Sequence, residues 1–252
     1  MPSESAQTED LLNARRFKLS KPSSLNDPFD MIPAMSRNAP PDHVRQFLEW
    51  NAQSQGLLVS ITPKMVADFK AQTDRESQKT DFDRAQLLPR TRLLCLTSRD
   101  DGVMMWSHYA SRHAGFVVGF KTEVLSRVSP SCSFFEVVYE DRPLCTPLDF
   151  IHVGMNYGLA EKVFSVKSRE WAYEKEWRCL FGIGQLGGSE FLSFPPAAVD
   201  SIILGSLVSA ETEKLLKNAC QAGGIPETVQ LRRGRLSAQS FSIETEPTTW
   251  RV

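Results

Sequence analysis

The chain has 252 residues, of which 41% are hydrophobic and 23% are charged. This composition is typical of a globular protein that is long enough to bury a core without disulfides or metals. The 29 Lys and Arg residues against 30 Asp and Glu residues leave a net charge of -1. Charge therefore gives no support to a nucleic-acid partner or to an anionic membrane partner.

The five cysteines are scattered singly and form no Cys-x-x-Cys pair, so neither a disulfide framework nor a zinc finger is indicated. The first ten residues are polar and acidic and carry no signal-peptide pattern. No apolar run reaches the length that crosses a bilayer. We therefore expect a cytoplasmic location, no membrane partner and a single domain over residues 1–252.

A turn is predicted over residues 21–30, where two prolines stand close together. Pro22 and Pro28 exclude a helix because proline breaks helical hydrogen bonding. Asn26 and Asp27 can satisfy nearby backbone donors, so we expect a rigid polar loop that places polar groups at the rim of a pocket or has a purely structural role.

Helices are predicted from about residue 41 to residue 82, because apolar residues recur there at three- and four-residue spacing. Residues 72–84 are charged and contain few apolar residues, which favours a connector. We interpret residues 36–90 as a helical insertion or lid.

The rest of the chain mixes helices and strands without regular alternation and without a Gly-x-Gly-x-x-Gly fingerprint. This mixture predicts an α+β protein with a mixed central sheet of short strands and flanking helices. Further helices are predicted over residues 8–14, 103–114 (with Gly115 as a left-handed stop), 148–166 and 210–222. Strands are predicted over residues 16–20, 91–97, 116–120, 134–139, 171–178 and 199–205, and in a last hairpin over residues 228–233 and 241–244.

The run Trp171-Ala-Tyr-Glu-Lys-Glu-Trp-Arg178 carries two acids and an arginine at alternate positions. Because residues two apart on a strand face the same way, a strand here would set Glu174, Glu176 and Arg178 in one row. Two carboxylates roughly 6–7 Å apart repel each other unless the arginine or a ligand compensates them. The row is therefore a candidate site, and the alternative is a solvated strand face with an ion pair.

A second cluster lies in the run Trp106-Ser-His-Tyr-Ala-Ser-Arg-His113. His108 and Arg112 share one face of the predicted helix, and His108 either donates to a ligand or a carboxylate or has a structural role. The two histidines are five residues apart rather than four, so we predict no metal site. At this spacing Trp106 and Tyr109 are typical of core residues.

Four segments follow one another along the chain: Leu19-Ser-Lys-Pro-Ser-Ser-Leu-Asn-Asp-Pro-Phe-Asp30, Met105-Trp-Ser-His-Tyr-Ala110, the run from Trp171 to Arg178, and Ile202-Ile-Leu-Gly205. In type and order they resemble a widespread bacterial family of uncharacterised domains. The likeness covers residues 15–245. It implies no activity, because that family is itself a domain of unknown function.

The pair Glu174-Lys-Glu176 also resembles the late Glu-x-Glu strand of the ADP-ribosyltransferase fold. This second resemblance implies NAD as cofactor and a preorganised glutamate that stabilises an oxocarbenium-like transition state. It implies Glu176 as the catalytic residue and Glu174 as its orienting partner, with Arg178 beside them. The N-terminal strand motif typical of that fold is not found before the Asn-Asp-Pro loop. The implied NAD contacts are His108, Tyr109, Trp106 and Asn26.

We therefore expect an NAD-dependent, ADP-ribosyltransferase-like bacterial enzyme that acts on a macromolecule, as a toxin or defence effector. The first alternative is a non-catalytic ligand-binding or protein-interaction domain, in which the Glu-Lys-Glu-Trp-Arg strand is an ion-paired structural element. The second alternative is a metal-dependent hydrolase or nuclease, which needs a divalent ion held by Glu174, Glu176 and Asp27.

Overall fold

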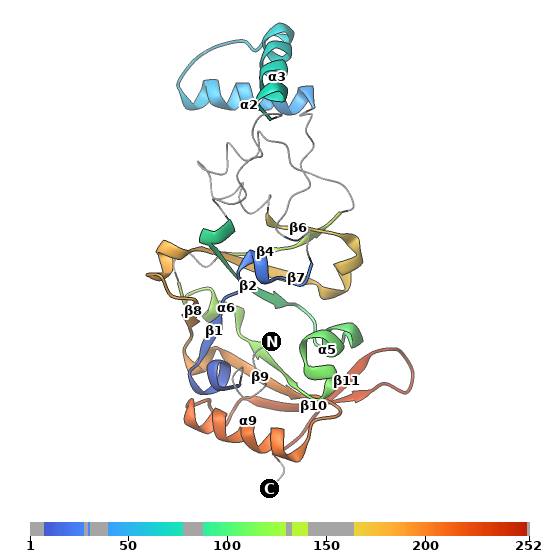
Figure 1. Cartoon of the computed structure of the whole chain (residues 1–252). Coiled ribbons are helices and arrows are strands. Elements are labelled where there is room, and N and C mark those ends of the chain that lie inside the picture. Colours follow the sequence, from blue (N-terminus) through green and yellow to red (C-terminus); the bar gives the residue numbers. More distant parts are fainter. Residues whose placement is uncertain are drawn as a thin grey trace. The chain divides into compact units, whose positions relative to one another are not determined.

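The computed structural model describes residues 8–27, 30, 40–77, 88–129, 133–140 and 164–250. The chain divides into two units (Figure 1). The first unit combines residues 1–20, 91–136 and 170–252, and the second combines residues 21–90 and 137–169. That the whole chain forms a single domain over residues 1–252 stays a prediction.

Short helices and strands alternate irregularly along the first unit. Its helices are η1 (Glu9–Asn13), α5 (Val103–Tyr109), η4 (Ser111–His113), α6 (Thr122–Leu125), η5 (Arg169–Glu174), η6 (Ile183–Leu186), η7 (Pro196–Ala198) and α9 (Ala210–Ala222). Its strands are β1 (Arg16–Lys18), β2 (Thr91–Thr97), β3 (Phe116–Phe120), β4 (Phe134–Glu136), β7 (Glu176–Gly182), β8 (Phe191–Ser193), β9 (Val199–Leu204), β10 (Gln230–Leu236) and β11 (Ile243–Pro247).

Three sheets are formed by these strands. The largest has the order β11-β10-β9-β3, in which β9 and β10 run parallel and the other pairs run antiparallel. The second is antiparallel with the order β2-β7-β4, and the third pairs β1 with β8. Helices combined with mixed and antiparallel sheets confirm the predicted α+β class.

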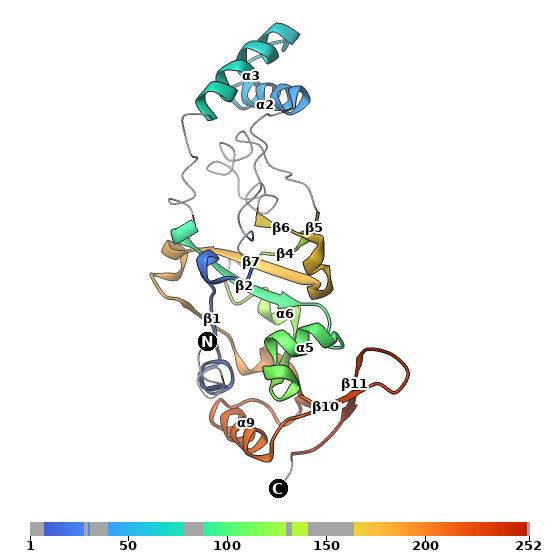
Figure 2. The same ribbon diagram turned by 45° about the vertical axis from the view of Figure 1, so that its right-hand side comes forward.

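Strand β9 separates two hydrophobic clusters of the first unit. Ile202 and Leu204 belong to the main cluster, together with Leu216 of α9. Ile203 faces the other way, because alternate residues of a strand point to opposite sides, and it belongs to a smaller cluster with Trp106 of α5. Helices α9 and α5 therefore cover opposite faces of the largest sheet (Figures 1 and 2).

Several predicted elements have the observed bounds. The strands over residues 91–97 and 116–120 and the helix over residues 210–222 are confirmed as β2, β3 and α9.

Helix α5, which was predicted to run to residue 114, ends at Tyr109. Residues 111–113 all have positive φ angles, of 48°, 53° and 69°, which a right-handed helix does not contain. Gly115 is not among the glycines with positive φ, so its role as a left-handed stop is wrong. A Cβ on Gly115 would lie 3.0 Å from the carbonyl carbon of Ala110, so this glycine allows a close backbone approach.

The predicted strand over residues 171–178 begins later than expected. Residues up to Glu174 form the 3-10 helix η5, and strand β7 begins at Glu176. Between them Lys175 has a φ of 45°, which interrupts any extended backbone. The prediction of one strand row that contains Glu174 is therefore wrong, and only Glu176 and Arg178 lie on the same strand.

The second unit contains a pair of helices and a small parallel pair of strands. Helices α2 (Pro41–Ser54) and α3 (Pro63–Ser77) pack through Val44, Ile61 and Val66. The helices predicted within residues 36–90 are thus observed, and their role as an insertion or lid stays a prediction. The other elements are η2 (Pro22–Ser24), η3 (Leu88–Arg90), β5 (Val138–Tyr139) and β6 (Val166–Lys167).

Two further predictions are corrected by the pairing of β5 with β6. The strand predicted over residues 134–139 is two strands, because β4 pairs with β7 whereas β5 pairs with β6. The helix predicted over residues 148–166 does not extend to Val166, which lies in β6. Residues 148–163 of that prediction, and residues 78–84 of the predicted connector, lie outside the described residues. None of the helices in the described part of the chain has the length and apolarity needed to cross a bilayer.

Candidate functional site

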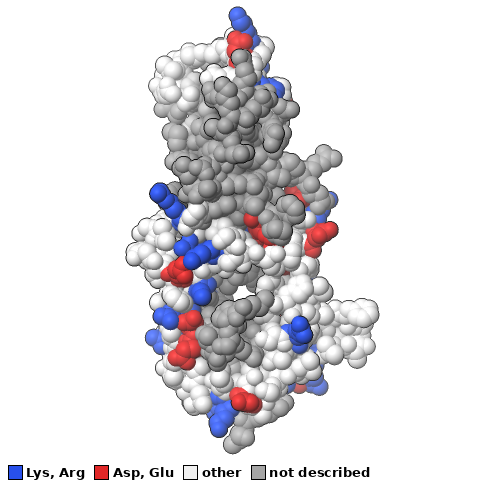
Figure 3. Space-filling model, in the orientation of Figure 1, with Lys and Arg blue, Asp and Glu red and all other residues white. Residues whose placement is uncertain are grey.

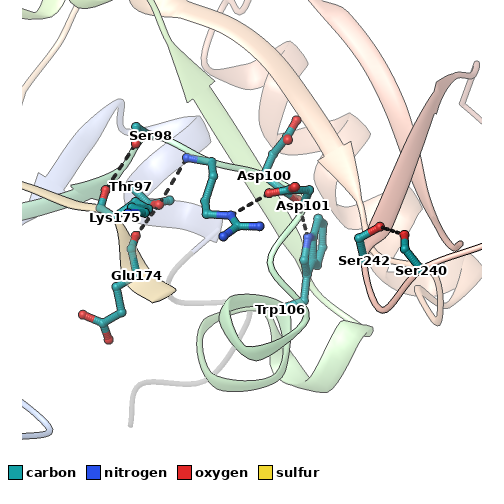
Figure 4. A network of polar contacts seen from close by, with 10 residues as sticks. Thr97, Ser98, Asp100, Asp101, Trp106, Glu174, Lys175, Ser240 and Ser242 are labelled. Carbon is teal, nitrogen blue, oxygen red and sulfur yellow. Dashed lines mark hydrogen bonds and ion pairs between the residues drawn. The ribbon is translucent and has the colours of Figure 1, made fainter. Parts of the chain in front are cut away.

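The backbone between η5 and β7 is held by the end of strand β2. The hydroxyl of Thr97 donates to the carbonyl oxygen of Glu174 at 2.6 Å, and the backbone N–H of Ser98 donates to the carbonyl oxygen of Lys175 at 3.1 Å. The N–H of Arg99 in turn donates to the hydroxyl of Thr97 at 3.3 Å. In Figure 4 the carboxylate of Glu174 points away from this network. These bonds stabilise the turn at Lys175, which separates the two glutamates into different environments.

Glu176 and Arg178 form a bidentate ion pair on strand β7. Arg178 Nε donates to Glu176 Oε1 at 2.7 Å, and Arg178 Nη2 donates to Glu176 Oε2 at 2.9 Å. The side chain of Arg178 is 0% exposed and that of Glu176 is 7% exposed. A buried guanidinium is tolerated only with such a partner, because an uncompensated charge in the interior is costly. The pair is therefore part of the sheet interior.

The register of the second sheet explains why this pair is buried. Arg178 stands between Cys95 of β2 and Phe135 of β4, and Glu176 stands beside Thr97 of β2. Strand β7 is the central strand, so its side chains have neighbours on both sides within the sheet. The sequence-based alternative of an ion-paired structural strand agrees with these contacts for Glu176 and Arg178.

Glu174 is also buried, but its partner is an aromatic hydroxyl from α5. The hydroxyl of Tyr109 donates to Glu174 Oε1 at 2.6 Å, which is short, as expected for a charge-assisted hydrogen bond. Glu174 is 3% exposed, whereas Tyr109 is 53% exposed. The Tyr109 ring therefore stands at the surface with its hydroxyl fixed by a buried carboxylate. The prediction that Tyr109 is a core residue is wrong, because the last turn of α5 points it outwards.

A row of ring contacts leads from Tyr109 through His108 and Tyr173 to Trp171. The His108 ring is 6.1 Å from the Tyr109 ring and 6.0 Å from the Tyr173 ring. The ring centroids of Trp171 and Tyr173 are 6.0 Å apart, and the Tyr173 hydroxyl lies 3.2 Å from His108 Nδ1. We call these four residues, His108, Tyr109, Trp171 and Tyr173, the aromatic face. It brings together the two sequence clusters that were predicted to form the site.

Two of the predicted cofactor contacts are not part of the aromatic face. Trp106 is 2% exposed, and its indole N–H donates to the carbonyl oxygen of Asp100 at 2.6 Å, so its prediction as a core residue is confirmed. Asn26 is exposed and follows η2 in the second unit, to which the aromatic face does not belong. The two histidines of the α5 region also have separate surroundings, because His113 lies beside Ser107 and stacks on Trp106.

The sequence reading missed Thr97 and the buried pair formed by Asp30 and Lys167. The Thr97 hydroxyl supports Glu174 through a bond to the backbone, which no side-chain motif reveals. Lys167 Nζ lies 3.4 Å from Asp30 Oδ2 in the second unit, and both side chains are buried. A lysine inside the apolar run Phe164-Ser-Val-Lys167 was the available signal for this pair, since a buried lysine needs a partner.

Charges of both signs lie on the surface of the molecule. On the face shown in Figure 3, Lys and Arg side chains alternate with Asp and Glu side chains. The hydrogen bond from Arg99 Nε, 2.6 Å from Asp101 Oδ1, lowers the pKa of the Asp101 carboxyl below its ordinary value. Within the described ranges, no group of three His, Cys, Asp or Glu residues is placed to hold a metal ion.

Together the fold and these contacts define an α+β protein with a buried ion pair on one strand and an exposed aromatic face beside it. Residues 105–179 match a family model described as Protein of unknown function (DUF2971). The match includes most of α5, all of η5 and the first residues of β7, and it confirms the predicted resemblance to a family of uncharacterised domains. No curated protein and no solved structure matches the chain.

Proposed function

We propose that the first unit is a non-catalytic ligand-binding domain whose site is the aromatic face. The observation that carries this proposal is the contact between Tyr109 and Glu174, in which a half-exposed ring is held by a buried carboxylate at 2.6 Å. An exposed ring with a fixed hydroxyl has lost its rotational freedom before any ligand arrives. A ligand that stacks on it therefore loses less conformational entropy on binding.

The ligand class that suits the aromatic face is a planar cation. Aromatic rings bind planar groups by offset or edge-to-face contacts, and they attract cations through their negative faces. The carboxylate of Glu174 adds a negative charge behind Tyr109, which favours a cationic ring over a neutral one. Of the four rings, those of His108 and Tyr109 are exposed and those of Trp171 and Tyr173 are half-buried.

The contacts of Glu176 do not fit a catalytic role in an NAD-dependent transferase. Both of its carboxylate oxygens accept hydrogen bonds from Arg178, and the pair is buried. A glutamate that stabilises a cationic transition state needs access to the reacting ribose, whereas the side chain of Glu176 is only 7% exposed. The non-catalytic proposal assigns Glu176 and Arg178 to the stability of the sheet instead. NAD remains a useful probe, because its nicotinamide ring is a planar cation.

The test is a titration of the purified full chain with 1-methylnicotinamide, which is a planar pyridinium cation, and with nicotinamide, its neutral analogue. Thermal stabilisation and tryptophan fluorescence report binding. We expect saturable binding of the cation, binding weakened about tenfold for nicotinamide, and loss of binding in Tyr109→Ala. Phe241→Ala is the matched control, because Phe241 is a fully exposed aromatic residue outside the aromatic face.

Two results would overturn the proposal. One is equal binding of the cation by wild type and Tyr109→Ala. The other is release of nicotinamide from NAD that is lost in Glu176→Gln while this variant remains folded, because that outcome requires a catalytic Glu176.

A further inference from the structure

A cavity of about 270 Å³ lies in the first unit, between α9 and the parallel strands of the largest sheet. It is separate in its residues from the aromatic face. Its lining comes from β9, α9, the connection between α9 and β10, strand β10 and the segment after β11: Ile202, Lys217, Cys220, Gln221, Ile225, Pro226, Glu227, Val229, Leu231 and Trp250.

The floor of the cavity is apolar. Ile202 and Ile225 are buried members of the main cluster, and Leu231 and Trp250 pack against the same cluster. Cys220 is buried as well, and burial raises the pKa of its thiol to about 11, so the thiol is neutral at physiological pH. The wall formed by Cys220 is therefore uncharged, and the floor favours a hydrocarbon or aromatic group.

The position of Trp250 is fixed by the end of the chain after β11. The backbone N–H of Thr248 donates to the carbonyl oxygen of Leu231 at 3.0 Å, which ties this segment to β10. Trp250 thus forms a side of the cavity with a broad ring, which suits stacking on an aromatic group.

Two opposite charges line the same cavity. Lys217 lies on α9 and Glu227 on the connection that follows it, and Lys217 is half-buried. Among the residues that the structure describes, no ion pair joins Lys217 to Glu227 or to another carboxylate. Opposite charges that share a cavity without pairing can each bind a complementary group of one ligand.

We propose that this cavity binds a small α-amino acid with an apolar side chain. The ligand carboxylate pairs with Lys217, the ligand ammonium pairs with Glu227, and the side chain packs on the apolar floor beside Trp250. The volume agrees with this size, because a cavity of roughly 150 Å³ holds a benzene molecule. A single ring with a short charged arm fills the remaining space. Gln221, one helical turn from Lys217 on α9, supplies an amide for a further hydrogen bond.

The test is isothermal titration of the full chain with L-phenylalanine and three partial analogues. 3-Phenylpropanoate lacks the ammonium, 2-phenylethylamine lacks the carboxylate, and L-alanine lacks the ring. We expect saturable binding of L-phenylalanine and affinities at least about tenfold weaker for each analogue, because each has lost one charged contact or the apolar contact.

The variants Lys217→Met and Glu227→Gln are expected to weaken L-phenylalanine binding about tenfold. Both residues are partly or fully exposed, so the variants are expected to fold. Lys214→Met is the matched control, since Lys214 is an exposed lysine on the same helix outside the cavity, and Tyr109→Ala is the control for the aromatic face. Absence of binding at millimolar L-phenylalanine would refute the proposal. Equal affinities for 3-phenylpropanoate and L-phenylalanine would also refute it, because they would indicate a plain carboxylate site. Wild-type affinity for L-phenylalanine in both Lys217→Met and Glu227→Gln would refute it as well.

Discussion

The end of η5 and the start of β7 each carry one glutamate of the Glu174-Lys-Glu176 run, and the two glutamates have different partners. Glu176 is bound by the guanidinium of Arg178 inside a sheet, whereas Glu174 accepts a hydrogen bond from the exposed Tyr109. Only the turn at Lys175 separates them. Residues that are neighbours in a motif can therefore belong to different parts of a structure, one stabilising the interior and the other supporting a surface.

The sharpest test of this difference is the removal of one charge on β7. Glu176→Gln removes the carboxylate that forms a bidentate pair with the buried Arg178, so we expect the free energy of unfolding to fall by about 3–5 kcal/mol in urea denaturation. Glu136→Gln is the control, since Glu136 is exposed on the neighbouring strand β4. The double variant Glu176→Leu with Arg178→Met is expected to recover most of the loss, because neither charge remains buried. A change below 1 kcal/mol in Glu176→Gln would show that Arg178 finds water or another partner.

A smaller effect is expected on the other side of the turn. Tyr109→Phe keeps the ring but removes the hydrogen bond to Glu174, so the buried carboxylate loses one donor. We expect a loss of about 1–2 kcal/mol in the same urea experiment. If Tyr109→Phe lowers the free energy of unfolding as much as Glu176→Gln does, the contacts of the two glutamates contribute equally to stability. That result would contradict the different roles assigned to Glu174 and Glu176.

The turn itself can be tested at Lys175. A lysine at a φ of 45° carries a steric cost that glycine does not, so Lys175→Gly is expected to stabilise the fold by up to about 1 kcal/mol. The loss of backbone entropy for glycine offsets part of this gain. Thermal unfolding of Lys175→Gly against Lys175→Ala separates the two contributions, because alanine retains the steric cost. Destabilisation by glycine relative to alanine would contradict the left-handed turn.

The smallest expected effect concerns the pH dependence of the Arg99 and Asp101 pair beside Thr97. The hydrogen bond from Arg99 lowers the pKa of Asp101 in the folded state, so the pair contributes stability above the unfolded pKa of about 4. This contribution is lost as the pH falls through the lower folded pKa. Because both side chains are more than a third exposed, we expect no more than a few tenths of a kcal/mol. The difference in unfolding free energy between wild type and Asp101→Asn should be smaller at pH 2 than at pH 7, and a difference that grows in acid would contradict the assignment.

Local patterns in the sequence predicted many elements of the fold. The helix over residues 210–222 was predicted from apolar residues at helical spacing, and Leu216 and Ala219 of α9 are buried in the main cluster. Residues 91–97 were predicted as a buried strand, and the observed bounds of β2 agree. Both predictions rest on apolar residues within the element itself.

The candidate site was predicted only in part, because its geometry depends on contacts between distant segments. The sequence indicated the aromatic residues around positions 108 and 173 and the ion pair of Glu176 with Arg178 as an alternative to catalysis. It did not reveal the end of α5 at Tyr109, which depends on the positive φ angles of residues 111–113. It also did not reveal the bond from Thr97 to the backbone of Glu174, which joins residues 77 positions apart.

The sequence by itself determined the α+β class, the main helices and strands, and the residue types that gather near the site, since these follow from composition and periodic burial. The tertiary structure alone decided which glutamate is buried with a cation and which supports a surface ring. The physical reason is that the positive φ angle of Lys175 turns the backbone between the two glutamates, so that their side chains have different neighbours. Hydrogen bonds from Thr97 and Ser98 hold this turn in place. No local pattern encodes those bonds.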